Sequence, residues 1–361
     1  SQLPVIGQSI YDLVDSSNRA SLNFDGFLDA EGGSSTGSSF TSFITQDTTW
    51  NVLNGAIAQT IHVTDGNTLT IAAGTVLKVA SGAELVVDEG GKLLIQGTQE
   101  QPVTFTSEAA AVNSWKGIRF EGARADDSEI VIDHAIIEYA DKALYTNKLG
   151  VKVKVTNSTV RHNNYGVYVD AAFNSAPNHP IITFKNGALY DNVRYNYYTK
   201  GFYGNAITTI DATGNWWGSS QLQAIGQSIY DLVDSSNRAS IDFNGYLDAE
   251  GGQSTGTSYT SFITQDTTWN ATDGEIAQPI HITQGNTLTI AAGTVLKVAT
   301  GAELVVDEGA KLLVQGTSEL PVLFTSDAAV VNSWKGIRFE GARANDSEIV
   351  IDHAIIEYAD K

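Results

Sequence analysis

The chain has 361 residues and a formal net charge of −20, because its 41 Asp and Glu residues outnumber its 21 Lys and Arg residues. Such a charge argues against nucleic acid or anionic lipid as a partner, and the absence of Cys excludes disulfides and thiol chemistry. No apolar run reaches membrane-spanning length, so we expect no membrane insertion.

The sequence aligns with itself without a gap when it is shifted by 219 positions, so that Ser1 matches Ser220 and Lys142 matches Lys361. Most differences between the two copies are mild, such as Ile95 against Val314. Solenoid repeats are about 20–50 residues long, so a period of this length indicates a duplicated domain. We expect the chain to be a window on a longer array of such units.

The repeat divides the chain into five predicted segments. They are a C-terminal cap of a preceding unit at 1–31, a connector at 32–48, a complete unit with its cap at 49–248, a second connector at 249–267, and the incomplete start of a further unit at 268–361. The connectors are rich in Gly, Ser and Thr, a composition typical of linkers.

Strand signals begin in the first copy and follow one another along the chain, each with alternating apolar and polar residues. They are NTLTIAAGTVLKVA (67–80), AELVVDEGGKLLIQG (83–97), PVTFTS (102–107), WKGIRFEG (115–122) and SEIVIDHAIIEYAD (128–141). Three later phrases, at 155–169, 184–198 and 210–218, share a shape with residues 131–141 and recur at roughly 24–29-residue intervals. That interval is typical of one turn of a parallel β-helix, so we predict an all-β fold of tandem β-helix units.

The phrase IYDLVDSS has a different pattern from the strands. Ile6, Ile10, Leu13 and Val14 fall on one face of a helix. We predict a short capping helix here, because an uncovered end of a coil stack would expose unpaired backbone groups.

The order of these motifs resembles that of a known group of proteins. GTVLKVASGAELVVDEGGKLLIQG leads to PVTFTS, then to WKGIRFEGA, IDHAIIEYAD, GNWWG and IYDLVDS. This succession resembles bacterial cell-surface proteins with a right-handed parallel β-helix. The resemblance implies an extracellular or cell-surface location, but it is weak for activity, because adhesins, stalks and enzymes share this scaffold.

Catalytic candidates are few in the sequence. Asp133, His134 and Glu138 lie close together, but adjacent strand residues point to opposite faces, which favours a ladder at a corner of the coil. Tandem duplication of a whole unit is also unusual for an enzyme. We therefore predict that the chain is not an enzyme.

Metal candidates are carboxylates of the cap segment that reappear unchanged in both copies. They are Asp12, Asp15, Asp29 and Glu31 in the first copy and Asp231, Asp234, Asp248 and Glu250 in the second. Ca²⁺ takes six to eight oxygen ligands, so clustered carboxylates favour it. Calcium is the one cofactor that the sequence suggests; helix capping and solvated acidic turns are the alternative explanation.

Carbohydrate candidates lie in the stretch YDNVRYNYYTKGFYGN (190–205). Exposed tyrosines on a flat sheet face can stack on sugars, and we select Tyr195, Tyr197, Tyr198 and Tyr203 as contacts. Strand alternation would place some of these tyrosines in the core instead.

Together these patterns favour an extracellular structural or adhesive protein that forms a stalk, fibre or filament. Its expected partners are copies of itself, through end-to-end or strand-addition contacts, and surface glycans. The alternative is a polysaccharide-binding or polysaccharide-degrading β-helix, of the lyase or hydrolase kind.

Overall fold

The structure is a computed structural model that describes residues 38–40, 42–122, 130–175, 178–204, 207–326, 328–341 and 348–361. It divides into two compact units, unit 1 from Ser1 to Gly204 and unit 2 from Asn205 to Lys361. The predicted cap at 1–31 lies outside the described residues, and the other predicted segment boundaries stay predictions.

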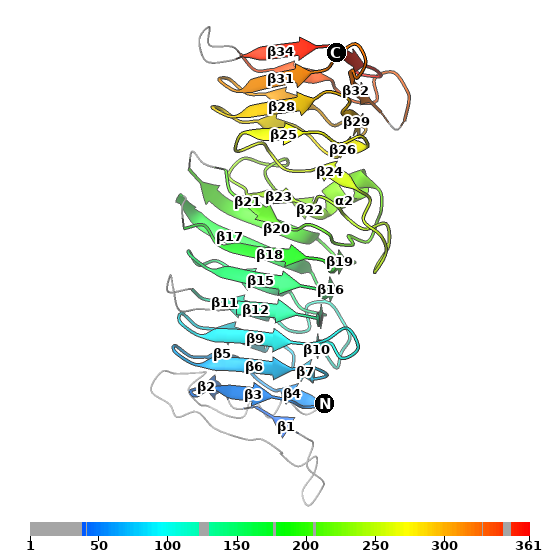
Figure 1. The fold of residues 1–361 in the computed structure, drawn as a ribbon. Coiled ribbons are helices and arrows are strands. Elements are labelled where there is room, and N and C mark those ends of the chain that lie inside the picture. The colour runs from blue at the N-terminus through cyan, green and yellow to red at the C-terminus, as the bar shows by residue number, and fades with distance from the viewer. Residues whose placement is uncertain are drawn as a thin grey trace, which may run out of the picture. The chain divides into compact units, whose positions relative to one another are not determined.

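Unit 1 is a stack of coils, each made of three short strands that belong to three parallel sheets (Figure 1). The first sheet contains β1 (Ser38–Ser39), β4 (Gly55–Ile57), β7 (Val76–Val79), β10 (Val103–Thr106), β13 (Ala135–Glu138), β16 (Thr159–Arg161) and β19 (Ala188–Tyr190). The second contains β2 (Phe43–Ile44), β5 (Ile61–Val63), β8 (Glu84–Val87), β11 (Gly117–Phe120), β14 (Lys142–Thr146), β17 (Tyr165–Ser175) and β20 (Tyr195–Tyr203). The third contains β3 (Thr48–Trp50), β6 (Thr68–Ala72), β9 (Lys92–Gln96), β12 (Ile130–Asp133), β15 (Lys152–Thr156) and β18 (Ile181–Lys185). The predicted all-β parallel β-helix is confirmed.

The core of unit 1 runs along the inside of the coils. In the first sheet, Leu77, Phe105, Ile137, Val160 and Leu189 are register partners on successive strands, and all five are fully buried. Burying one such side chain contributes about 1.5–3 kcal/mol. Because polar residues alternate with these apolar ones, each strand presents its polar side chains outward.

Unit 2 begins with a cap segment and continues as a second coil stack. The cap holds β21 (Thr209–Asp211), α2 (Leu222–Ser228), β22 (Ile229–Tyr230) and β23 (Ser240–Asp242). One sheet of the stack contains β24 (Thr257–Tyr259), β26 (Gly274–Ile276), β29 (Val295–Val298), β32 (Val322–Thr325) and β35 (Ala354–Ile356). The others contain β27 (Ile280–Ile282), β30 (Leu304–Val306) and β33 (Ile337–Phe339), and β25 (Thr267–Trp269), β28 (Thr287–Ala291), β31 (Lys311–Gln315) and β34 (Ile349–Asp352).

The capping helix is shorter than predicted and lies earlier in the chain. The predicted helix of the first copy falls outside the described residues, but its counterpart in unit 2 is α2, which buries Ile225 and ends at Ser228. Ile229 already belongs to β22, and turns follow it. The prediction failed for the IYDLVDSS phrase because Asp231 bonds to backbone N–H groups there and favours a turn. Among the described residues, no helix has the length and apolar character needed to cross a bilayer.

Candidate glycan-binding face

Five tyrosines lie on the outer face of the second sheet of unit 1. Tyr145 in β14, Tyr168 in β17 and Tyr198 in β20 are register partners and form one column. Tyr165 and Tyr195 form a second column where β17 and β20 begin. The ring centroids of Tyr168 and Tyr198 are 4.7 Å apart, and those of Tyr165 and Tyr168 are 5.1 Å apart. We call these five side chains the tyrosine face.

Strand alternation separates the tyrosine face from the core. The residue before each tyrosine of the first column points inward, and these three residues, Leu144, Val167 and Tyr197, are fully buried. Successive side chains of a strand point to opposite faces, so the tyrosines that follow point outward. They are half-buried, which leaves ring surface open to a ligand.

A ladder of asparagines fixes the corner from which β17 and β20 begin. Asn163 is fully buried, and its Nδ2 donates to Asn192 Oδ1 at 3.0 Å. Its Oδ1 accepts from the backbone N–H of Ala140 at 2.8 Å, and Asn192 Nδ2 donates to Asn196 Oδ1 at 2.9 Å. Because an unpaired buried amide is costly, these bonds hold successive coils in one register and align the tyrosine columns.

Cations lie beside the tyrosine rings. Lys142 Nζ is 4.6 Å from the ring centroid of Tyr145 and 4.9 Å from that of Tyr168. The Arg194 guanidinium lies over Tyr165, 5.7 Å from its centroid, and donates to the Tyr165 hydroxyl at 3.1 Å. A cation over an aromatic face is attracted to its π electrons. The tyrosine face therefore offers ring surface and positive charge side by side.

Two hydroxyls of this face, those of Tyr145 and Tyr168, have a raised pKa and stay protonated at physiological pH. Burial raises the pKa of Tyr168, and the neighbouring Tyr198 and Asp170 raise it further. Burial likewise raises the pKa of Tyr145, with a contribution from Asp170. A protonated phenol can donate and accept hydrogen bonds, so these hydroxyls suit the hydroxyl groups of a sugar.

Arg119 lies next to the tyrosine face, between two carboxylates. Its Nε donates to Glu84 Oε1 at 2.9 Å, and its Nη1 pairs with Glu121. Lys148 Nζ lies 3.3 Å from the other oxygen of Glu121. Arg119 is the register partner of Tyr145, so this charged cluster continues the first tyrosine column. It brings acid, base and cationic groups to one edge of the aromatic surface.

A histidine–aspartate pair lies on the same sheet. His62 Nδ1 is 2.9 Å from Asp88 Oδ1, and the ring of Phe43 stacks on the imidazole at 5.1 Å. Both features return in the second copy, with His281 Nδ1 2.7 Å from Asp307 Oδ1. The Arg119–Glu84 bond returns there as well, between Arg338 and Glu303 at 2.9 Å. The charged groups therefore occur in both copies.

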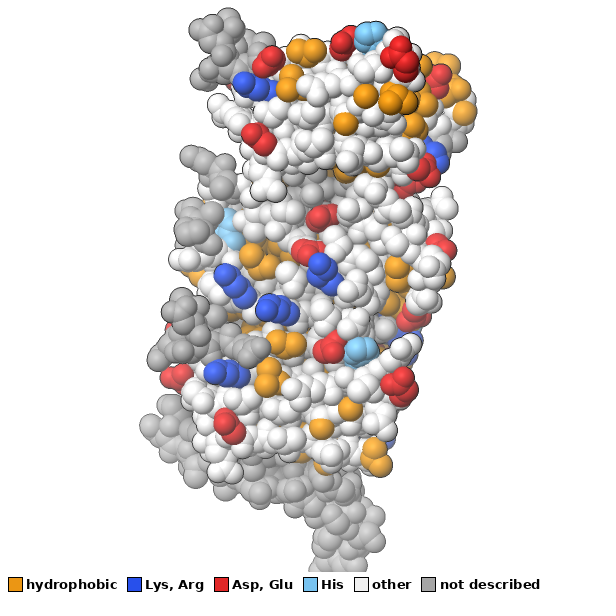
Figure 2. Space-filling view, viewed as in Figure 1, with side chains coloured by type: hydrophobic (Ala, Val, Ile, Leu, Met, Phe, Trp, Pro, Cys, Tyr) orange, Lys and Arg blue, Asp and Glu red, His pale blue; other side chains and the backbone are white. Residues whose placement is uncertain are grey.

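The middle segment of the chain, residues 143–218, differs from the rest of the chain in charge. It carries seven Lys and Arg against three Asp and Glu, although the whole chain has a net charge of −20. Lys152 and Lys154 are exposed on β15 of the third sheet, and Lys185 follows on β18. Figure 2 shows several basic side chains on the face of unit 1 that carries the third sheet. The middle of the chain thus suits an anionic ligand better than the remainder does.

The charged cluster of Arg119, Glu84 and Glu121, but not the tyrosine face, lies in a range that matches a known family. A family model described as a pectate-lyase-like β-helix domain matches residues 42–143 and again residues 261–359, together more than half of the chain. The chain belongs to this family. No curated protein and no solved structure matches it. Pectate-lyase-like β-helices are typically polysaccharide lyases or hydrolases, so the prediction that the chain is not an enzyme is contradicted.

The four tyrosines of this pectate-lyase-like β-helix that the sequence analysis selected lie in different environments. Tyr195 and Tyr198 belong to the tyrosine face. The choice of Tyr197 is wrong, because alternation points it inward, where it is fully buried and its hydroxyl donates to the Ile182 carbonyl at 2.5 Å. Tyr203 is 40% exposed but lies beyond an irregularity in the register of β17 and β20.

Three tyrosines of the face and its charged cluster were missed in the sequence. They are Tyr145, Tyr165, Tyr168, Arg119, Glu84 and Glu121. Writing the sequences of successive coils one below another, with register partners aligned, would have revealed the two tyrosine columns.

The carboxylates predicted to bind calcium are described only in the second copy, because Asp12, Asp15, Asp29 and Glu31 lie outside the described residues. Asp231 is buried, and its two oxygens accept from the backbone N–H groups of Val233 at 2.9 Å and Ile241 at 2.8 Å. Asp248 accepts from the Gln253 N–H at 2.8 Å. Among the described residues, Asp231, Asp234, Asp248 and Glu250 include no group of three within ligand distance. Calcium binding by this set stays a prediction.

The triplet Asp133, His134 and Glu138 is split between two sheets. Burial raises the pKa of Asp133, but hydrogen bonds from Thr156 at 2.7 Å and Asn157 at 2.8 Å outweigh it and leave the pKa below its ordinary value. Glu138 lies on the first sheet and accepts from Arg161 at 3.3 Å. These residues link neighbouring coils, in agreement with the ladder favoured by the sequence.

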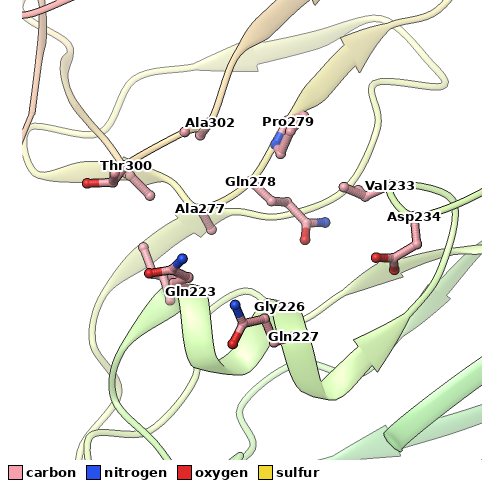
Figure 3. Close-up of a pocket in the computed structure, with 13 residues that line it drawn as sticks. Gln223, Gly226, Gln227, Val233, Asp234, Ala277, Gln278, Pro279, Thr300 and Ala302 are labelled. Atoms are coloured by element: carbon pink, nitrogen blue, oxygen red, sulfur yellow. The ribbon is translucent and has the colours of Figure 1, made fainter. Parts of the chain in front are cut away.

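Unit 2 contains a pocket of about 210 Å³ between the cap segment and the second coil stack (Figure 3). Gln223, Gln227 and Gln278 contribute amide groups to its lining, and Asp234 contributes a carboxylate. Gln278 also donates to the Thr260 carbonyl. The lining contains no aromatic ring and no cation, so the pocket offers a polysaccharide less than the tyrosine face does.

Proposed function

We propose that this pectate-lyase-like β-helix binds and depolymerises an acidic polysaccharide on the outer face of the second sheet of unit 1. The observation that carries the proposal is the tyrosine face with Lys142, Arg194 and Arg119 beside it. A pyranose ring presents an apolar face that can stack on an aromatic ring, and its hydroxyls can bond to the phenols.

The direction of the sugar chain follows from the stacking of coils. Successive parallel strands are about 4.8 Å apart, so the column Tyr145, Tyr168 and Tyr198 repeats at that interval along the helix axis. One sugar unit spans roughly the same distance. A polysaccharide lying along the axis would therefore meet one ring per coil.

Positive charge beside the tyrosine rings favours an acidic ligand. Lys142 lies within cation–π distance of two rings, so a carboxylate on a stacked sugar would meet an ammonium group. The excess of basic residues in 143–218 attracts a polyanion to this region. A neutral polysaccharide would gain the stacking contacts but not this attraction.

The chemistry would take place where the charged cluster meets the column. Cleavage of an acidic polysaccharide needs a general acid and base, and a cation to neutralise the carboxylate of the substrate. Arg119 can supply the cation, and Glu84 and Glu121 are the carboxylates within reach of it. The tyrosine column would position the bond to be cleaved over this cluster.

The test measures binding and products on the same substrates. Polygalacturonate and its fully methyl-esterified form share a backbone but differ in the charge and ester methyl of each carboxyl group, and we expect tighter binding and cleavage of the charged form. An unsaturated product that absorbs in the ultraviolet would indicate a lyase, whereas new reducing ends without it would indicate a hydrolase. Lys142→Ala should weaken binding of the charged form more than Lys154→Ala does, because Lys154 is exposed on the third sheet and adds only to the general attraction. Equal binding of both forms would refute the acidic ligand.

Self-association is a second candidate function. We propose that copies of the chain pair end to end or by strand addition, because the parallel sheets of a β-helix have edge strands that can accept another strand. Sedimentation should then reveal concentration-dependent dimers, and a single monomeric species at every concentration would contradict the proposal.

The location is also a proposal. Polysaccharide substrates of this size lie outside the cell, and the chain has neither Cys nor Met to oxidise there. We infer that the protein acts outside the cell or at its surface. Protease shaving of intact source cells should release it, and retention in the cytosolic fraction would contradict the inference.

A further inference from the structure

Three potential metal ligands of unit 2 come from three neighbouring coils. His281 lies in β27, Asp307 follows β30 and Glu340 follows β33. One ligand atom from each lies within 4.8 Å of the others. In the part of the chain that the structure describes, no other group of His, Asp and Glu residues meets this condition. The arrangement follows from register, because β27, β30 and β33 are consecutive parallel strands.

His281 is held in one orientation by two contacts. The ring of Phe262 stacks on the imidazole, with 4.6 Å between the centroids. Asp307 Oδ1 lies 2.7 Å from Nδ1, so the tautomer that carries its proton on Nε2 turns the Nδ1 lone pair toward this carboxylate. A metal ion can then take the place of the proton that Nδ1 and Asp307 otherwise share, and bind both groups. The imidazole is therefore oriented for an ion before one arrives.

We propose that His281, Asp307 and Glu340 bind a divalent transition-metal ion. One imidazole and two carboxylates suit Zn²⁺ or Mn²⁺, whereas Ca²⁺ requires six to eight oxygens. Three protein ligands also leave positions for water or an anionic ligand. This site differs in position and in ligand type from the carboxylate set selected from the sequence.

Arg338 is the competing cation at this site. Its Nη1 pairs with Glu340, but its Nε also donates to Glu303 at 2.9 Å. When Glu340 turns to the ion, Arg338 keeps Glu303 as its partner. The three carboxylates of this neighbourhood, Glu303, Asp307 and Glu340, outnumber the single arginine, so the local charge favours a dication.

The first copy provides a natural comparison with nearly the same residues. His62 and Asp88 are paired at 2.9 Å, and Glu121 corresponds to Glu340. Glu121 pairs with Arg119 and lies 3.3 Å from Lys148 Nζ. Among the described residues, His62, Asp88 and Glu121 do not come within ligand distance of one another. We therefore expect tight binding in the second copy and weaker binding in the first.

The test is Zn²⁺ titration of the full chain after chelator treatment, followed by calorimetry. We expect one tight Zn²⁺ per chain, with Ca²⁺ binding at least about tenfold weaker. His281→Gln and Glu340→Gln should each weaken Zn²⁺ binding at least about tenfold. His62→Gln, the matched control, should leave the tight site unchanged. Lys148→Ala should strengthen the second, weaker site.

A structural role for these residues predicts different results. His281→Gln can still bond to Asp307, so circular dichroism and urea unfolding should match the parent, which separates lost binding from lost folding. Co²⁺ bound at the site should give a visible absorption band that His281→Gln removes. Equal effects of His281→Gln and His62→Gln, or no tight Zn²⁺, would mean an adventitious ion only and would overturn the proposal. The result does not depend on polysaccharide cleavage.

Discussion

We predict that the buried carboxylate of Asp231 contributes more to the stability of unit 2 in acid than at neutral pH. Burial raises the pKa of Asp231 to about 7 from an ordinary value of 3.8, although hydrogen bonds from Ile241 and Val233 oppose the change. In the unfolded chain the group ionises near its ordinary value. Between these two values the folded state therefore binds more protons, and its free energy of unfolding falls as pH rises.

The size of this effect follows from the difference between the two pKa values. A difference of about 3 units corresponds to about 4 kcal/mol, because one unit equals about 1.4 kcal/mol. This stability is fully present below the unfolded pKa and is lost as pH rises through about 7. Between about pH 5 and pH 8 we expect a loss of about 3 kcal/mol. Burial also raises the pKa of Asp234, which acts in the same direction.

The assay compares the parent with Asp231→Asn in urea at a series of pH values. Asn cannot ionise, so the difference between the two free energies of unfolding isolates the contribution of Asp231. Asn also lacks the second acceptor for the N–H groups of Val233 and Ile241, so it should be less stable in acid by about 1–3 kcal/mol. A difference that is independent of pH, or that changes in the parent's favour as pH rises, would refute the argument.

Three further predictions concern unit 1. Tyr168→Ala should weaken polysaccharide binding by about 0.5–1.5 kcal/mol in calorimetry, whereas Tyr190→Ala on the first sheet should leave it unchanged; equal losses would count against the tyrosine face. Asn163→Ala should lower the free energy of unfolding of unit 1 by about 1–3 kcal/mol in urea, since it leaves buried partners unpaired. Phe105→Ala should cost about 3–5 kcal/mol by the same measurement, and a cost under about 1 kcal/mol would contradict the stacked core.

The strands between residues 67 and 141 could be predicted because most of them alternate between buried and outward positions, as β6, β9 and β10 do. NTLTIAAGTVLKVA became β6 and β7, and AELVVDEGGKLLIQG became β8 and β9. The secondary structure of the cap was harder to predict, because Ile229 fits a helical face as well as it fits the first position of β22. A buried acceptor such as Asp231 decides between them, and its bond to Ile241 joins residues ten positions apart. Local periodicity carries no information on such a bond.

The candidate site could be predicted only in part, because it is built across coils. Tyr195 and Tyr198 were visible in one phrase, but Tyr145 and Tyr168 join them through register. Arg119 and Glu84 meet through stacked strands although many residues separate them. The inward Tyr197 shows the opposite error, because a local cluster of tyrosines does not reveal which member faces the core.

Duplication was a weak ground for predicting a non-enzymatic role. Glu84 and Arg119 recur as Glu303 and Arg338, so the charged cluster is present in both copies. Parallel stacking allows this, since adding coils extends an outer face without disturbing the inner columns. A duplicated β-helix can therefore carry chemical groups on its outer face. The family match at 42–143 and 261–359 contains both copies of these groups and makes polysaccharide the ligand to test there.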